Sequence, residues 1–301
     1  MDKIISILSE NIKNENIYKN EPIRNHTYTK LGGKADIFVT PETVGELQAV
    51  LRTAKSLGQP ITILGSGSNV IVRDGGIRGI VIGMGKLNSI SVNGNRIKAQ
   101  SGAQIIDVSR IALKHSLTGL EFACGIPGSV GGALYMNAGA YGGQTADVLV
   151  QATVMDKDGV VHFFKKEEMG LGYRKSIFME KDYLIVEAEF ELEAGDSSEI
   201  KAKMDELTEA RESKQPLEYP SCGSVFKRPP GYFAGKLIQD SELQGKRIGG
   251  AEVSRKHAGF IVNIDDATSG EYLDLIEFVR RTVKEKFDVE LETEVIVLGE
   301  D

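Results

Sequence analysis

The sequence has little cysteine and no excess of positive charge, and each shortage excludes a class of protein. Of its 301 residues only Cys124 and Cys222 are cysteines, which is too few for a disulfide framework and is typical of a reducing compartment. They also lack CxxC spacing, so we expect no metal site and interpret both as buried free thiols. The formal net charge of −7 argues against general nucleic-acid binding.

A long apolar run is also missing. The N-terminus, MDKIISILSENIKNENIY, places Ile4 or Ile5, Leu8 and Ile12 on one helical face with charges between them, unlike the uninterrupted apolar core of a signal peptide. We therefore expect a cytoplasmic protein that has no membrane partner.

One segment has no charge at all. The 25 residues from Phe122 to Ala146, FACGIPGSVGGALYMNAGAYGGQTA, contain seven glycines and no charged side chain. Glycine, Pro127, Asn137 and Gln144 interrupt it too often for a membrane span. Its side chains are mostly too small for chemistry, so we predict a folded loop whose backbone N–H groups face a ligand at close range.

A second small loop follows a predicted strand in ILGSGSNVIV, residues 63–72. Gly65-x-Gly67 suggests a Rossmann motif, but Val70 replaces the third glycine and β-forming residues follow where a helix should start. We interpret the loop as a tight turn between strands that can surround a pyrophosphate with N–H groups and the side chains of Ser66, Ser68 and Asn69. Neither loop ends in the Lys-Ser/Thr of a P-loop, which argues against an ATPase.

The remaining pattern mixes hairpins with a few helices and predicts an α+β fold. We expect a helix from Thr40 as N-cap to Gly58, and a C-terminal helix opened by the capping box Thr268-x-x-Glu271. Asn93-Gly94 and Asp158-Gly159 predict two hairpins. Further elements are expected as strands at 61–64, 70–72, 80–82, 183–193 and 292–298 and as a helix around Ile200, Met204 and Leu207.

Positive charge gathers in one part of the chain. From Ser221 to His257 there are seven Lys or Arg and three acids, a net +4, while the rest sums to −11. A solvated basic face explains this cluster as well as a site for an anionic small molecule does.

Six segments in order resemble the UDP-N-acetylenolpyruvoylglucosamine reductases, the MurB family. They are NHTYTKLGGKADIFVTP, LGSGSNVIVRDGG, GLEFACGIPGSVGGALYMNAGAYGG, YRKSIF, CGSVFKRP and LETEVIVLG. The resemblance implies noncovalent FAD in a vanillyl-alcohol-oxidase (PCMH) type domain, NADPH as reductant, and reduction of an enolpyruvyl UDP-sugar for peptidoglycan synthesis. It implies an FAD-binding region at 1–200, with subdomains at about 1–85 and 86–200. A smaller α+β substrate domain follows at 201–301, and its last strand returns to the active site.

The resemblance also implies site residues. Ser224 matches the proton donor, and Arg174 and Glu294 match the pair that stabilises an enolate, with Glu292 an alternative to Glu294. Substrate contacts are implied for Tyr173, Lys227, Lys236, His257 and Asn263. Cofactor contacts are implied for Gly65, Ser66, Gly67, Ser68, Asn69, Gly125, Pro127, Gly128, Ser129, Gly131, Gly132, Asn137, Gly139, Ala140 and Ile185.

Other interpretations remain open. His257 is also compatible with a packing or capping role. The short chain between Tyr173 and the strand at 183 resembles the branch of the family that lacks an extra substrate-covering loop. We expect a monomer. The alternatives are another PCMH-type flavin oxidase, with His26 or Cys124 as nominal attachment points, and a non-enzymatic nucleotide-binding module.

Overall fold

The computed structural model describes all residues from 1 to 301, and the chain forms two compact units. Unit 1 comprises 1–19, 36–66 and 79–211, and unit 2 comprises 20–35, 67–78 and 212–301. The sequence division at residue 200 assigned 20–35 and 67–78 to the first domain, whereas the structure groups them with the C-terminal segment. Unit 2 is therefore assembled from three separate parts of the chain.

The first sheet of the chain has the strand order β1-β2-β5-β3. Its strands are β1 (Ile17–Pro22), β2 (Lys34–Val39), β5 (Ile77–Gly83) and β3 (Ile61–Leu64), and β3 pairs in parallel with β5. In unit 1, helices α1 (Asp2–Leu8) and α2 (Val44–Ser56) contact one another. Their apolar faces share one core with Ile80 and Ile82 of β5, as the sequence periodicity predicts.

Helix α2 begins later than predicted. Its N-cap is Thr43, whose hydroxyl accepts the N–H of Glu46, and the Glu46 carboxylate accepts the N–H of Glu42 at 2.7 Å. The prediction of Thr40 as N-cap was wrong, because the Thr43 hydroxyl caps the helix three residues further on.

The second sheet of unit 1 is antiparallel, in the order β12-β11-β13-β7-β6. Both predicted hairpins are confirmed, with Gly94 at φ 61° and Gly159 at φ 76° in their turns. The five strands are β6 (Ile90–Asn93), β7 (Arg96–Gln100), β11 (Leu149–Asp156), β12 (Val161–Lys165) and β13 (Tyr183–Glu191).

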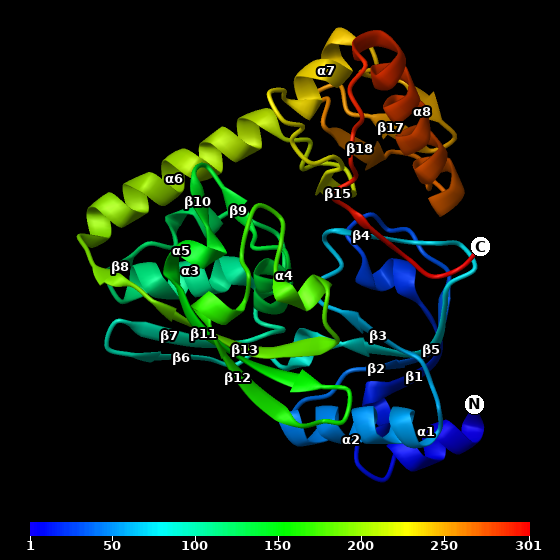
Figure 1. Ribbon diagram of the computed structural model, residues 1–301, viewed down its shortest axis with the longest axis vertical. Helices are drawn as coiled ribbons and strands as arrows, with labels where there is room; N and C mark the ends of the chain where they lie inside the picture. Colours follow the sequence, from blue (N-terminus) through cyan, green and yellow to red (C-terminus); the bar gives the residue numbers. More distant parts are fainter. The chain divides into compact units, whose positions relative to one another are not determined.

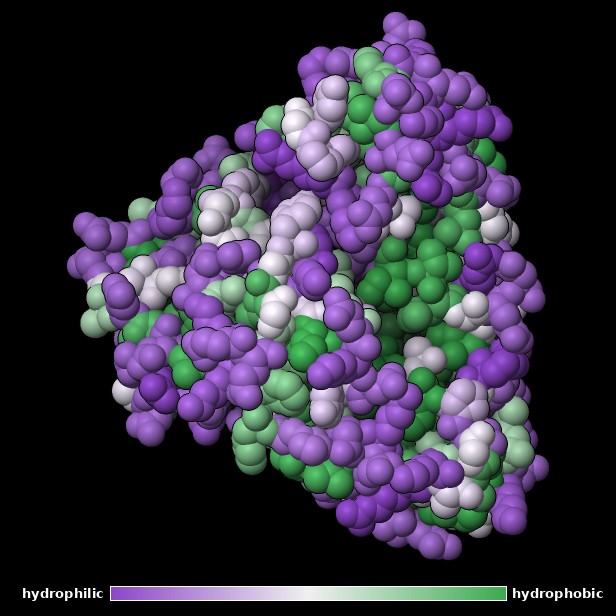
Figure 2. Space-filling view, in the orientation of Figure 1, coloured by the Kyte–Doolittle hydropathy of each residue, from purple (hydrophilic) through white to green (hydrophobic).

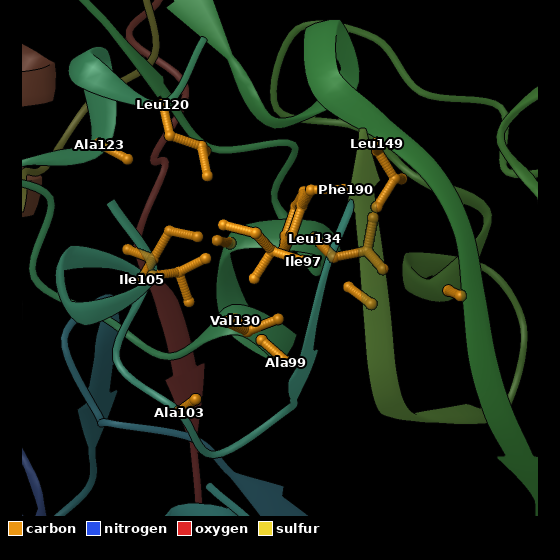
Figure 3. Packing of buried hydrophobic residues seen from close by; sticks show 14 of the residues in the cluster. Ile97, Ala99, Ala103, Ile105, Leu120, Ala123, Val130, Leu134, Leu149 and Phe190 are labelled. Carbon is orange, nitrogen blue, oxygen red and sulfur yellow. The ribbon is translucent and has the colours of Figure 1, made fainter. Parts of the chain in front are cut away.

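Short helices complete the core of unit 1. Helix α4 (Val130–Tyr135) contacts β13 and β7, and Figure 3 shows Val130 beside Ala99 and Ala103 in this core. The other elements here are α3 (Ile105–Lys114), α5 (Thr145–Val148), and the small pairs β8 (Leu117–Thr118) with β14 (Glu193–Ala194) and β9 (Gly139–Ala140) with β10 (Gly143–Gln144). Short 3₁₀ turns lie at Asn14–Asn16, Ile23–His26, Met84–Lys86, Glu121–Ala123, Lys166–Glu168 and Ile177–Met179.

Helix α6 (Ser197–Lys214) carries many charges and buries only Ile200, Met204 and Leu207. These three pack with Cys124 in a small separate cluster. Charged and polar residues also cover most of the face seen in Figure 2, broken by hydrophobic patches. None of the helices is long and apolar enough to cross a membrane.

Unit 2 is built on a sheet in the order β15-β18-β17-β16, drawn in yellow to orange in Figure 1. Helices α7 (Ala234–Asp240) and α8 (Ser269–Phe287) share its core. The strands are β15 (Ser221–Ser224), β16 (Arg247–Ile248), β17 (Ala251–Val253) and β18 (Phe260–Asn263). A separate parallel pair joins β4 (Val70–Val72) to β19 (Ile296–Leu298).

The predicted capping box of α8 is confirmed. The Thr268 hydroxyl accepts the N–H of Glu271 at 3.1 Å, and the Glu271 carboxylate accepts the N–H of Thr268 at 3.0 Å. Tyr272 and Val279 of this helix are buried, whereas Phe287 is 37% exposed. The apolar face of α8 therefore meets solvent at its last turn.

Thr268→Ala should lower the free energy of unfolding of unit 2 by about 1 kcal/mol, because the Glu271 N–H loses the hydroxyl that accepts it. Denaturant unfolding followed by circular dichroism measures this. Thr282→Ala is the matched control, since the Thr282 hydroxyl only donates to Phe278 O four residues earlier in the same helix. Equal stability of Thr268→Ala and the parent would contradict the capping role.

Candidate functional site

The two glycine loops meet within unit 1. A Cβ built on Gly65 would lie 2.5 Å from Ser129 Oγ, and the Ser66 hydroxyl accepts a hydrogen bond from Gln104 Nε2 at 2.9 Å. Gln104 in turn lies opposite Ser129 in an isolated antiparallel bridge. Gly65 therefore lies against the uncharged segment within unit 1, and Gln104 links Ser66 to that segment.

The segment after Pro127 contacts its neighbours through backbone. Ile105 N–H donates to Gly128 O at 3.0 Å, and Gly131 N–H donates to Ser101 O at 2.9 Å. A Cβ on Gly131 would lie 2.8 Å from the Ser101 Cβ, so this approach needs glycine. Ser129 is the N-cap of α4 and its hydroxyl accepts the N–H of Gly132 at 3.3 Å.

Several backbone donors of these loops are unused. The N–H groups of Gly65, Ser66, Gly125 and Gly128 donate no hydrogen bond within the chain. Backbone donors are rarely left without a partner. Unused donors on segments without charge fit a ligand with acceptor oxygens, such as a dinucleotide pyrophosphate.

Asn137 organises the end of the uncharged segment. Its Nδ2 donates to Gln144 Oε1 at 3.0 Å and to Gly172 O at 2.9 Å, and its Oδ1 accepts the N–H of Ala146 at 2.9 Å. All of its amide hydrogens are used inside unit 1. The predicted contact with a cofactor therefore cannot come from a free Asn137 donor, because the side chain closes the β9–β10 hairpin region and holds residue 172.

Tyr173 and Arg174 form the corner of a tight turn. Gly172 and Lys175 exchange backbone hydrogen bonds at 3.0 and 3.2 Å, and Arg174 has φ 52°. The Arg174 guanidinium donates to Gly139 O at 3.4 Å and lies 5.2 Å from the centre of the Tyr173 ring. The predicted enolate-stabilising arginine is thus attached to the same loop as the predicted cofactor glycines.

The other predicted cofactor residues of unit 1 differ in exposure. Pro127 and Gly132 are exposed, Gly139 and Ala140 are half-buried in β9, and Ile185 of β13 is buried within the larger core.

Ser224 lies at the end of β15 in unit 2. A bulge separates the pairs Ser221 with Val262 and Ser224 with Phe260, and Gly223 at φ 76° lies within it. The irregular backbone re-aims the serine, as bulges do next to functional sites. The Ser224 hydroxyl donates to Phe226 O at 3.3 Å.

Gly259 lies between Ser224 and His257. A Cβ on Gly259 would be 3.5 Å from Ser224 Oγ and 3.3 Å from His257 Nδ1. The Gly259 N–H donates to Nδ1 at 3.1 Å, and burial lowers the pKa of His257. A neutral ring that accepts at Nδ1 carries its proton on Nε2, so His257 offers an N–H donor near Ser224.

Glu294 and Glu292 lie on the extended segment beside Ser224. Glu294 N–H donates to Val225 O at 2.8 Å, and Asn69 Nδ2 donates to Glu294 O at 3.1 Å. Glu292 instead forms an ion pair with Lys227.

The second half of the first loop lies in unit 2. Asn69 holds the Glu294 backbone, and Tyr28 N–H donates to Gly67 O at 3.0 Å. A Cβ on Gly67 would lie 2.1 Å from His26 O, which only glycine permits. Ser68, between them, is half-buried.

The basic segment of unit 2 is partly neutralised by acidic partners. Lys236 pairs with Asp240, and Arg255 pairs with Glu252 at 3.2 Å. Arg247 lies 3.8 Å from Asp265, and Lys246 lies over the Phe278 ring at 4.6 Å. Acidic partners in the folded chain therefore balance part of the positive charge excess of this segment.

Asn263 is committed to the fold. Its Nδ2 donates to Thr29 O at 3.0 Å and its Oδ1 accepts the N–H of Ala267 at 2.8 Å. The residue is 6% exposed. Its side chain therefore stabilises the fold, and the predicted substrate contact stays a prediction.

Sequence reasoning missed three residues that position the sites. Gln104 holds Ser66, Ser176 donates to Tyr135 O at 2.7 Å and anchors the Tyr173–Arg174 turn, and Gly259 separates His257 from Ser224. Ser176 stands inside the YRKS motif and was open to prediction, whereas Gln104 carries no sequence signal.

Cys124 does not suit covalent flavin attachment. Its thiol lies 3.5 Å from Met204 O and packs against α6. His26, the other nominal candidate, lies 2.9 Å from a Glu21 carboxylate oxygen.

Comparison with known proteins identifies the two parts of the chain. The FAD binding domain family model matches residues 35–164, and the C-terminal domain model of UDP-N-acetylenolpyruvoylglucosamine reductase matches residues 215–298. The first model spans residues of both units, in keeping with a division that is not contiguous.

Relatives extend the match to the full length. UDP-N-acetylenolpyruvoylglucosamine reductase 2 of Bacillus cereus is 60% identical over 301 residues, which are 100% of this chain and 99% of that protein. The reductase of Shouchella clausii is 62% identical over 95% of this chain and 92% of its own length. The crystal structure of the MurB reductase from Thermus caldophilus superposes with a TM-score of 0.80 at 34% identity, covering 93% of this chain and 98% of that one. The chain therefore belongs to the UDP-N-acetylenolpyruvoylglucosamine reductase family.

Proposed function

We propose that the protein reduces the enolpyruvyl ether of a UDP-N-acetylglucosamine substrate to UDP-N-acetylmuramate, with FAD as cofactor and NADPH as reductant, in peptidoglycan precursor synthesis. The observation that carries this proposal is that the chain segments holding Ser224 and Glu294 lie side by side. They are joined by a hydrogen bond from Glu294 N–H to Val225 O at 2.8 Å. The full-length similarity to named reductases supports it. We further propose that the enzyme acts as a cytoplasmic monomer.

The residues of the glycine loops fit FAD. Unused N–H groups at Gly65, Ser66, Gly125 and Gly128 suit its pyrophosphate. Asn137 would act by holding the loop in place, and Ile185 would act as part of the core behind it. The bound FAD would be lined by the other predicted cofactor residues, which are Gly67, Ser68, Asn69, Pro127, Ser129, Gly131, Gly132, Gly139 and Ala140. When bound and reduced, FAD supplies the hydride for the alkene carbon.

Ser224 is proposed to donate the proton that completes the reduction. Hydride addition leaves negative charge beside the substrate carboxylate, and the adjacent carbon must then gain a proton. The Arg174 guanidinium would stabilise this charge, and Glu294 would assist as the second member of the pair. The turn that fixes Arg174 to Gly139 O keeps the cation in place before substrate binds.

Substrate binding is assigned to five of the remaining predicted side chains. The neutral His257 would donate from Nε2, and Tyr173, 58% exposed, is open to contact. Lys227 and Lys236 would exchange their carboxylate partners for the UDP pyrophosphate. Asn263 would support the site mainly through its bonds to Thr29 and Ala267.

Ser224→Ala should separate the two half-reactions. NADPH should bleach bound FAD at the parent rate, because that step needs no proton at the substrate carbon. Reoxidation by the enolpyruvyl substrate should slow by roughly 10²–10⁴-fold, which is the usual contribution of a positioned acid. Anaerobic stopped-flow absorbance in the flavin band, with each half-reaction started separately, measures both rates.

Ser221→Ala is the matched control, because Ser221 lies on the same strand and has no proposed chemical role. If the substrate reoxidises Ser224→Ala as fast as it reoxidises the parent, Ser224 is not the proton donor and its hydroxyl has only a structural role. Glu294 acting through a water would then become the candidate acid.

Lys227→Ala should weaken substrate binding at low salt, and the difference from the parent should shrink as salt rises, because screening already weakens the charge in the parent. Glu292→Gln should leave binding unchanged or strengthen it, since it removes the carboxylate that pairs with Lys227. Titration of substrate into the oxidised enzyme measures both. Unchanged affinity of Lys227→Ala at low salt would reject this contact, and Lys284→Ala on α8 serves as a surface control.

A further inference from the structure

Arg211 lies against the uncharged glycine segment of unit 1. It belongs to the last turn of α6, and a Cβ built on Gly125 would lie 2.8 Å from its Cδ, 3.6 Å from its Nε and 3.8 Å from its Nη1. Tyr141 and Cys124 act to raise the pKa of Arg211, against the larger effect of burial. The Arg211 side chain therefore passes directly over the α-carbon of Gly125.

Arg211 has no partner in the chain, unlike Lys201 and Lys203 of the same helix. Lys201 pairs with Asp205 and Lys203 pairs with Glu206 on the exposed side of the helix. Arg211 forms no ion pair and no hydrogen bond within the chain, although it is partly buried and burial lowers the pKa of its guanidinium. Removing a cation from water without a partner is costly, so the arrangement calls for an anion from outside the chain.

The surroundings of Arg211 supply the other half of an anion site. The N–H groups of Gly125 and Gly128 are unused, and the segment Phe122–Ala146 has no charge of its own. A guanidinium beside unbonded backbone donors is the usual composition of a phosphate site.

We propose that Arg211 binds a phosphate of a nucleotide pyrophosphate at Gly125, and that this nucleotide is FAD. The choice of FAD rests on the proposed function. It is favoured over a UDP-sugar or NADPH because Gly125 belongs to the segment whose Ser129 meets Gly65 in unit 1. Glycine at 125 leaves the space that the Arg211 side chain occupies.

The test uses full-length apoprotein, freed of flavin, and Arg211→Met, which keeps the length of the side chain and removes the charge. Quenching of flavin fluorescence measures the Kd of FAD and of riboflavin, which has the same ring and no phosphate. The Kd of FAD should rise by about ten- to hundredfold, the usual effect of losing a charged hydrogen bond, while that of riboflavin stays unchanged. ADP, which carries the pyrophosphate without the flavin ring, should displace FAD from the parent and compete less well at the variant.

Two further variants keep the outcome specific. Arg110→Met removes an exposed arginine of α3 that pairs with Asp107, and it should bind FAD as the parent does. Gly125→Ala places a methyl group against the Arg211 side chain, and it should weaken FAD binding in the same direction.

Other results would overturn the proposal. Unchanged FAD affinity in Arg211→Met would remove the role, and an equal loss for riboflavin would assign Arg211 to the flavin ring or to folding. A loss confined to UDP-sugar or NADPH binding would reject FAD as the source of the phosphate. A parent apoprotein that binds no FAD would refute the proposed function itself, and this proposal with it.

Discussion

The structure depends on the close approach of backbone to backbone along the uncharged segment. Gly131 lies where a Cβ would clash with Ser101, Gly65 where it would meet Ser129, and Gly139 where it would meet Gly143 O at 2.6 Å. The contact of Gly139 with backbone needs glycine, and Gly65 and Gly131 leave room for serine side chains. Together they turn the chain into a surface of peptide groups. A site built this way binds through N–H donors in fixed positions, and it has to take its positive charge from side chains outside the segment.

Those side chains are attached to the segment by the fold. The turn of Tyr173 and Arg174 is fixed at three points, through Asn137 to Gly172 O, through Arg174 to Gly139 O and through Ser176 to Tyr135 O. Arg211 reaches the segment from α6 at Gly125. Unit 2 also uses a glycine to bring site residues together. Gly259 allows His257 and Ser224 to lie close, and its N–H fixes the tautomer of the imidazole.

Sequence reasoning succeeded where the cause of a structure is local. The capping box at Thr268, the hairpins at Gly94 and Gly159 and the β-turn-β interpretation of Gly65-x-Gly67 each follow from a few neighbouring residues. It failed where distant residues decide the outcome. The grouping of 67–78 with the C-terminal segment depends on the pairing of Val70–Val72 with Ile296–Leu298, and the neutralisation of the basic segment depends on Glu292 and Asp265. The resemblance named Asn137 as a cofactor residue, but only the structure shows that its amide is used to hold the loop.

The central claim is that the glycine loops hold FAD without a covalent bond and that NADPH reduces this bound FAD. The most direct measurement is the absorbance spectrum of the purified protein under anaerobic conditions, before and after NADPH, followed by denaturation and filtration. The account predicts an oxidised flavin spectrum that bleaches with NADPH, and a yellow filtrate over a colourless polypeptide. A protein that takes up no flavin on reconstitution, or one whose yellow colour stays with the denatured chain, would contradict it.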